Sequence, residues 1–168
     1  PRGRRIAIAG ISGGFAVASA DYCNELGLEV PEFSAELQNR IRYDVKVPSF
    51  AAVKNPVDIS AETRPPYLMN CVEMVINDPG IDAVLMGMWS WPLPPADETL
   101  RRLESIQRES GKPLLLCYYG SRRGAELVQS LTWLPVYGTP EEICQVMAAM
   151  ADYADYRRRT GTFPGQGA

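Results

Sequence analysis

Short apolar segments alternate with amphipathic segments along most of this chain, and that order constrains the fold more than any other feature. The apolar segments have the length of buried strands, and apolar residues recur at helical spacing between them. Strands that alternate with helices predict an α/β domain, in which helices cover both faces of a mostly parallel sheet. We expect strands at 5–9, 28–31, 81–88, 114–118 and 134–137, and helices at about 15–26, 35–43, 68–76, 97–110, 121–131 and 140–159.

The five expected strands fit a three-layer, flavodoxin-like domain with strand order 2-1-3-4-5, because crossovers between parallel strands are right-handed. The domain is expected to span residues 1–159, with an irregular stretch at 45–63. Residues 160–168 include three glycines and a proline, so we expect a disordered tail there.

The composition narrows the classes of partner. A formal net charge of −3 gives no chain-wide attraction to nucleic acid or to an anionic membrane. No apolar run approaches the ~20 residues of a membrane span, and the first residues lack the apolar stretch of a signal peptide. The four cysteines have neither a metal-binding spacing nor the density of a disulfide framework. We therefore expect a cytoplasmic chain with reduced, buried thiols and no metal, nucleic-acid or membrane partner.

The sequence contains no histidine. This excludes Ser-His-Asp and Cys-His nucleophile pairs, histidine metal sites and phosphohistidine chemistry from what the chain does unaided. An active site made of these residues alone would use backbone amides, carboxylates, guanidinium groups or hydroxyls. The alternative is a site shared with another polypeptide segment.

A glycine turn between the first strand and the first helix is the best candidate site. Ser12, Gly13 and Gly14 precede the helix, so their amides are expected to point outward at its positive end. This arrangement holds a phosphate or a carboxylate without a charged side chain. The turn matches neither the dinucleotide fingerprint nor the P-loop. The structural alternative is an ordinary strand-to-helix turn, in which glycine and a serine cap are common.

The segment Asn55-Pro56-Val57-Asp58 is the second candidate. Asparagine before proline is extended, and Asp58 can accept backbone hydrogen bonds or cap the segment that follows. A tight turn held by such capping is the simpler interpretation of these residues alone.

Two pairs of residues carry weaker signals. Arg122 and Arg123, at the start of a helix, could hold a second anion, although a solvated arginine pair is the simpler interpretation. Trp89 and Trp91 lie in a proline-rich segment. They could cover a pocket or dock a neighbouring domain, or they could belong to an ordinary loop packed on its own domain.

Several segments together resemble the last flavodoxin-like domain of NDP-forming acyl-CoA synthetases, relatives of succinyl-CoA synthetase. The resemblance covers residues 5–156, and its specificity comes from the order of the segments rather than from any single motif. The segments are 5–14, 25–31, 55–58, 77–84, 111–113 and 134–142.

The resemblance implies a part of an enzyme that interconverts an acid, CoA and NTP with acyl-CoA, NDP and phosphate. In such enzymes a histidine on another domain carries the phosphoryl group, and CoA-binding and ATP-grasp domains hold CoA, ATP or GTP, and Mg²⁺. The domain resembled here contributes a helix N-terminus that helps to hold the phosphohistidine, a role that falls on Ser12, Gly13 and Gly14. Asn55, Pro56 and Asp58 are expected to lie near the same site, and this domain alone is expected to bind no cofactor.

One departure from the family pattern concerns the glycine turn. Phe15 and Ala16 stand where a third glycine or a proline is often found. Bulk at this place would narrow the approach of a phosphate.

Two other functions compete with this one. The chain could be a non-catalytic regulatory or docking module fused to an acetyltransferase, with Trp89 and Trp91 as interface anchors. It could also be a free-standing flavin or nucleotide binder.

Overall fold

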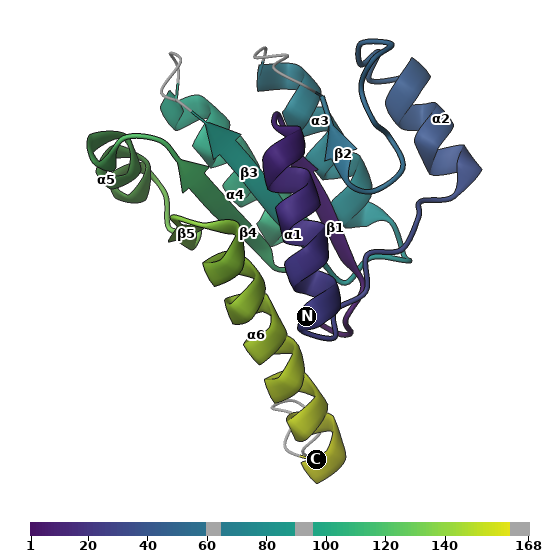
Figure 1. Cartoon of the computed structure of the whole chain (residues 1–168), viewed down its shortest axis with the longest axis vertical. Coiled ribbons are helices and arrows are strands. Elements are labelled where there is room, and N and C mark those ends of the chain that lie inside the picture. Colours follow the sequence, from purple (N-terminus) through teal and green to yellow (C-terminus); the bar gives the residue numbers. More distant parts are fainter. Residues whose placement is uncertain (60–64, 90–95, 162–168) are drawn as a thin grey trace.

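The computed structural model describes residues 1–59, 65–89 and 96–161 (Figure 1). It contains a five-stranded parallel sheet with the order β2-β1-β3-β4-β5, which confirms the flavodoxin-like order expected from the sequence. The strands are β1 (Ile6–Gly10), β2 (Val57–Asp58), β3 (Ala83–Trp89), β4 (Leu114–Tyr119) and β5 (Val136–Tyr137). The helices are α1 (Gly13–Glu25), α2 (Ala35–Tyr43), α3 (Pro65–Asn77), α4 (Ala96–Ser110), α5 (Arg122–Leu131) and α6 (Pro140–Thr160).

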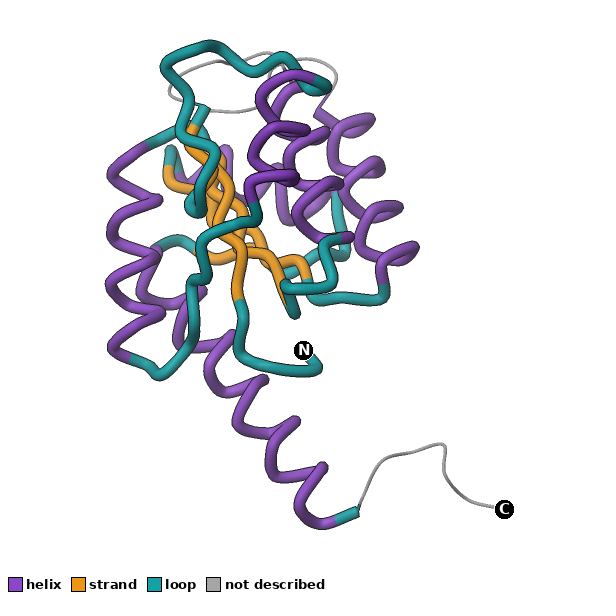
Figure 2. Tube along the Cα trace, turned by 90° about the vertical axis from the view of Figure 1, so that its right-hand side faces the viewer, coloured by secondary structure: helices purple, strands orange, loops and turns teal. Residues whose placement is uncertain are grey.

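Alternate side chains of the central strands enter two hydrophobic cores, one on each face of the sheet. On β1, Ala7 and Ala9 face one core, and Ile6 and Ile8 face the other. α1 and α6 cover the core that contains Ile6 and Ile8, whereas α3, α4 and α5 contribute to the opposite core, where α2 packs on α3. Figure 2 shows the strands between these two helical layers. Every residue of β1 is buried because a strand in such a sheet is covered on both faces.

The edge of the sheet next to β1 differs from the expectation. The strand predicted at 28–31 is wrong, because only Glu29 of that segment forms a bridge, and it does so with Arg5, the residue before β1. The edge strand is instead β2, which pairs with Ala9 and Gly10 and lies inside the stretch expected to be irregular.

The side chain of Asn55 fills the gap between Glu29 and β2. Its Nδ2 donates to the carbonyl of Ile6 at 3.0 Å and to that of Pro31 at 2.9 Å. Its Oδ1 accepts a hydrogen bond from the Ile8 amide at 3.0 Å. A carboxamide offers both an acceptor and two donors, as the backbone of a neighbouring strand would. One side chain therefore bonds the backbone in the middle of β1 on the edge opposite β3, where β2 does not reach.

Side-chain caps define several helix starts. Ser34 accepts a hydrogen bond from the Leu37 amide at 3.2 Å, and Ser121 accepts one from the Gly124 amide at 3.1 Å. Thr139 caps α6 in the same way, with Pro140 at the first helical position as the sequence predicts.

The far end of α6 lies one residue beyond the expected domain boundary. The helix runs to Thr160 and ends at Gly161, whose φ of 66° is the left-handed conformation that glycine adopts readily. The remainder of the predicted tail, 162–168, lies outside the described residues. In Figure 1 the last turns of α6 extend past the sheet. Arg4, which precedes β1, donates to Asp155 on this part of the helix at 2.9 and 3.0 Å.

Among the described residues, no helix has both the length and the apolar character needed to cross a membrane.

Candidate functional site

The start of α1 lies at the carboxyl edge of the sheet, where the strand order reverses between β1 and β3. β1 ends at Gly10, and Ser12 is the N-cap residue of α1 with extended backbone angles (φ −145°, ψ 120°). In open parallel sheets of this order, ligands bind at this place. The structure therefore puts the predicted glycine turn where the fold most often holds a ligand.

The backbone amides of this turn are available to an outside group. The first hydrogen bond of the helix runs from the Ala16 amide to the Ser12 carbonyl at 3.1 Å, so the amides of Gly13, Gly14 and Phe15 have no partner within the helix. Across the described residues no hydrogen bond to these three amides is present, and the Ser12 side chain does not cap them. Gly13 and Gly14 are exposed, and the first turn of α1 carries no acidic residue.

Phe15 does not cover the turn, although its bulk there suggested that it would. Its side chain is only 4% exposed and stacks on Tyr119, with ring centroids 5.8 Å apart and planes 16° from parallel. The ring lies over Gly87 of β3, where an added Cβ would be 2.4 Å from the ring. A glycine beneath the ring thus lets Phe15 turn into the core and leaves the amide edge open.

Asp58 lies beside the same turn. Its backbone pairs with Gly10, and one carboxylate oxygen lies 3.2 Å from the position that a Cβ on Gly13 would occupy. A carboxylate is favoured near a helix N-terminus by the helix dipole. The same charge repels a second anion at close range.

Asn55 and Pro56 directly precede β2, whose last residue, Asp58, lies at this edge of the sheet. The Asn55 side chain bonds across to β1 rather than within its own turn, so capping within the turn does not describe it. Its φ of 119° is uncommon for a residue other than glycine. The two residues thus have different roles. Asn55 forms hydrogen bonds with β1 at the edge of the sheet, and Asp58 lies beside the glycine turn.

The hydroxyl of Tyr119 is a member of this site to which the sequence assigned no role. Tyr119 ends β4 at the same edge, and its hydroxyl is buried without a hydrogen-bond partner among the described residues. Burial raises the pKa of Tyr119, the nearby Ser12 hydroxyl acts in the opposite direction, and the charge of Asp58 adds to the rise. An aromatic residue at the end of a buried strand is common, so the sequence carried no signal for this hydroxyl.

The arginine pair of α5 lies at an exposed helix start. Arg122 is 93% exposed at its side chain and pairs with Glu126 on its own helix at 3.0 Å. Arg123 is exposed as well. The cap of this helix start is supplied by Ser121, so the arrangement is that of a solvated helix end.

The prediction for Trp89 and Trp91 concerns a segment that lies largely outside the described residues. Trp89 is the last residue of β3, and Trp91 lies outside the described residues. The docking hypothesis built on this pair therefore stays a hypothesis.

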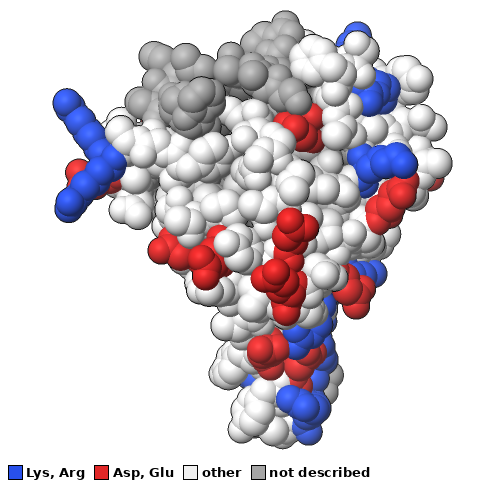
Figure 3. All heavy atoms as spheres, viewed as in Figure 1, with Lys and Arg blue, Asp and Glu red and all other residues white. Residues whose placement is uncertain are grey.

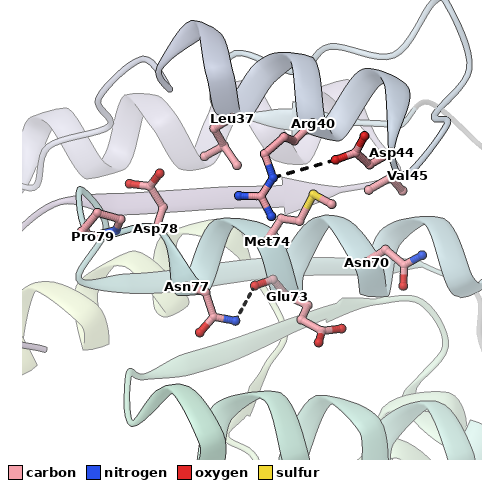
Figure 4. Close-up of a pocket in the computed structure, with 10 residues that line it drawn as sticks. All are labelled: Leu37, Arg40, Asp44, Val45, Asn70, Glu73, Met74, Asn77, Asp78 and Pro79. Atoms are coloured by element: carbon pink, nitrogen blue, oxygen red, sulfur yellow. Dashed lines mark hydrogen bonds and ion pairs between the residues drawn. The ribbon is translucent and has the colours of Figure 1, made fainter.

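A cavity of about 440 Å³ lies between α2 and α3, and Figure 4 shows that side chains from both helices line it. Arg40 reaches in from α2 beside Met74 of α3, and it lies 3.9 Å from Asp44. None of the predicted site residues lines this cavity. On the face drawn in Figure 3, acidic side chains lie over the middle of the molecule, and basic side chains lie at its margins and, together with acidic ones, on its projecting lower end. The described residues hold no cluster of three or more side chains that could bind a metal ion.

Comparison with known proteins places the chain in a family. Residues 6–117 match the model of the Ligase-CoA domain family. The alpha subunit of ADP-forming acetate–CoA ligase II from Pyrococcus furiosus is 28% identical over 165 residues, which cover 92% of this chain and 35% of that protein. ADP-forming acetate–CoA ligase II from Archaeoglobus fulgidus is 27% identical over 164 residues, which cover 94% of this chain and 24% of that protein.

A solved structure agrees with these relatives. The dinucleotide-forming acetyl-coenzyme A synthetase 1 of Candidatus Korarchaeum cryptofilum superposes with a TM-score of 0.78 at 25% identity. The match covers 95% of this chain and 35% of that one. The chain thus spans about a third or less of the length of each of these proteins. It belongs to the Ligase-CoA domain family and is homologous to one part of the larger NDP-forming acetyl-CoA synthetases.

Proposed function

We propose that this chain is one domain of an NDP-forming acyl-CoA synthetase, and that the start of α1 stabilises a phosphohistidine carried on another domain. The observation that carries the proposal is the set of amides at Gly13, Gly14 and Phe15, which have no partner in the described structure and lie at an exposed turn. The absence of histidine from the chain agrees with a nucleophile supplied from elsewhere.

The complete enzyme would convert an acid, CoA and NTP to acyl-CoA, NDP and phosphate. Its relatives include proteins named as ADP-forming acetate–CoA ligases, which supports an ADP-forming reaction on a small acid. Their greater length leaves room for CoA-binding, histidine-bearing and ATP-grasp domains, on which CoA, ATP or GTP, and Mg²⁺ would be held.

The contribution of α1 would be electrostatic. Amides fixed at a helix start donate to the phosphoryl oxygens without reorganisation, and each such donor in a closed, dry site lowers a barrier by about 3 kcal/mol. The Ser12 hydroxyl is a further donor beside the same turn. Asp58 could accept a hydrogen bond from the imidazole ring of the incoming histidine, because its carboxylate lies next to Gly13.

A substitution that removes one amide tests the proposal. Proline is well tolerated at the first helical position, which Gly13 occupies, and the extended Ser12 backbone suits a residue that precedes proline. Gly13→Pro deletes one N–H donor, whereas the control Gly13→Ala keeps it. We expect millimolar phosphate to shift the amide resonances of residues 13–15 in the unaltered chain and in Gly13→Ala.

In Gly13→Pro we expect the apparent affinity for phosphate to fall about tenfold, because a hydrogen bond to a charged group contributes about 1.5 kcal/mol. Chloride at matched ionic strength serves as the control for screening. Equal affinities in the two variants, or no shift of these amides at any phosphate concentration, would contradict the anion role.

A further inference from the structure

Two cysteines from opposite ends of the sequence are in contact inside the molecule. The Sγ atoms of Cys23 and Cys144 lie 3.7 Å apart, although the residues are 121 positions apart along the chain. Cys23 lies near the end of α1 and Cys144 near the start of α6. These two helices pack against each other on one face of the sheet (Figure 1).

The pair is enclosed in the core between α1 and α6. Both side chains are fully buried. The Cys144 thiol also lies 3.5 Å from the Ser19 carbonyl, and the Ser19 hydroxyl is buried without a partner in the described structure. The contact between the two thiols couples their ionisation, and burial acts to raise the pKa of both. A thiolate is the form that reacts with oxidants.

The other two cysteines do not share this arrangement. Cys71 belongs to the core on the opposite face of the sheet, and burial raises its pKa to about 12. Cys117 on β4 lies in the same core as the pair, but burial raises its pKa to about 12 as well. Among the described residues, Cys23 and Cys144 are the cysteines whose sulfur atoms are in contact.

We infer that Cys23 and Cys144 form an oxidative modification site, at which a hydroperoxide converts the two thiols into a disulfide that joins α1 to α6. The thiolate of one cysteine attacks the peroxide, forming a sulfenic acid and releasing hydroxide. The thiol of the other cysteine then attacks the sulfenic sulfur and expels water. In total, two thiols and one hydrogen peroxide give one disulfide and two waters. The sulfur atoms must close from 3.7 Å to the bonded distance of about 2.0 Å.

The crosslink would act on the packing of α1 and leave its N-terminal turn unchanged. Cys23 lies ten residues after Gly13, about 15 Å along the helix axis. A disulfide that closes so long a loop restricts the unfolded chain strongly. We therefore expect the oxidised chain to melt about 5–10 °C higher than the reduced chain, with unchanged phosphate binding.

The experiment uses the 168-residue chain with hydrogen peroxide at neutral pH, followed by alkylation, intact-mass measurement and peptide mapping. We expect a loss of 2 Da, two of the four thiols still free, and a single linked peptide pair that contains Cys23 and Cys144. Dithiothreitol should reverse the mass change and the rise in the melting midpoint. Cys23→Ala and Cys144→Ala should not form the crosslink, whereas the control Cys71→Ala should form it as the unaltered chain does.

Several outcomes would overturn the inference: no reaction, oxidation of one cysteine to sulfinic acid without a crosslink, a link that includes Cys71 or Cys117, or a link between two chains. The mapping is done on the unaltered chain, so the result stands even where a variant folds poorly.

Discussion

The Asn55 side-chain carbonyl accepts a hydrogen bond from the Ile8 amide at 3.0 Å, in the middle of β1. The same side chain donates to the carbonyl of Ile6 on that strand. Loss of these bonds leaves buried backbone groups without partners, which costs more than the bonds themselves contribute.

We expect Asn55→Ala to lower the free energy of unfolding by about 3 kcal/mol, since two backbone groups of β1 lose their partners. Urea unfolding followed by far-UV circular dichroism measures this. The control is Asn77→Ala, because the Asn77 side chain makes one exposed bond to the Glu73 carbonyl. Its cost should stay near 0.5 kcal/mol. Equal costs for the two variants would show that the Asn55 bonds do not support the sheet.

Asp58 is expected to weaken anion binding at the start of α1. Its carboxylate lies next to Gly13, so Asp58→Asn removes a repulsive charge and should tighten phosphate binding roughly threefold to tenfold. Titrations followed by the amide resonances of residues 13–15 measure the affinity. Added salt should reduce the difference between the variants. The matched control is Asp21→Asn on the same helix, about 12 Å further along, where little change is expected. Weaker binding in Asp58→Asn would mean that the carboxyl group contacts the anion favourably.

Gly87 is expected to be intolerant of any side chain. An added Cβ would lie 2.4 Å from the Phe15 ring, so Gly87→Ala should cost about 2 kcal/mol of stability through overpacking. Gly14→Ala is the control, because the nearest atom to its added Cβ is the Ser12 hydroxyl at 3.7 Å. Thermal and urea unfolding report both effects. If the clash is the cause, adding Phe15→Leu to Gly87→Ala should recover part of the loss, and an additive pair would refute this explanation.

The ion pair between Arg5 and Asp82 predicts a pH dependence of stability. Although burial alone raises the pKa of Asp82, the hydrogen bonds and charge of Arg5 outweigh it and hold this pKa below its ordinary value. A carboxyl group with a depressed pKa stabilises the fold above its unfolded pKa of about 3.9, and this contribution is lost as the pH falls through the folded value. The free-energy difference between the unaltered chain and Asp82→Asn should therefore be largest above pH ~4 and shrink below it.

Urea unfolding at several pH values between neutral and acidic measures this difference. Asp97→Asn is the control, because the Asp97 side chain is 46% exposed and its pair with Arg101 is a surface pair. Its effect should be small at every pH. A difference for Asp82→Asn that stays constant as the pH falls would contradict the assignment.

The sequence predicted the fold class because it depends on the period of apolar residues, and the strand order because crossovers between parallel strands are right-handed. The prediction of an edge strand at 28–31 was wrong for a physical reason. A strand of two residues has no period to detect, and the hydrogen bonds of Asn55 come from a side chain rather than from a strand. The apolar residues at 28–31 suggested a strand, yet only Glu29 forms a bridge, with Arg5 just before β1.

The candidate site was predictable in part. The glycine turn follows from the order of strand, glycines and helix, but the position of Asp58 beside Gly13 depends on the pairing of β2 with Gly10. The contact between Cys23 and Cys144 depends likewise on which helices share a face of the sheet. No local pattern in the sequence encodes that choice of neighbours.

The two outer strands of the sheet, β2 and β5, are each only two residues long. Exposed strand edges are the usual template on which one polypeptide adds to another in aggregates and amyloid. Here β2 and β5 each have too few extended residues for a strand of another molecule to pair with. The molecule is thereby protected against edge-to-edge self-association at high concentration.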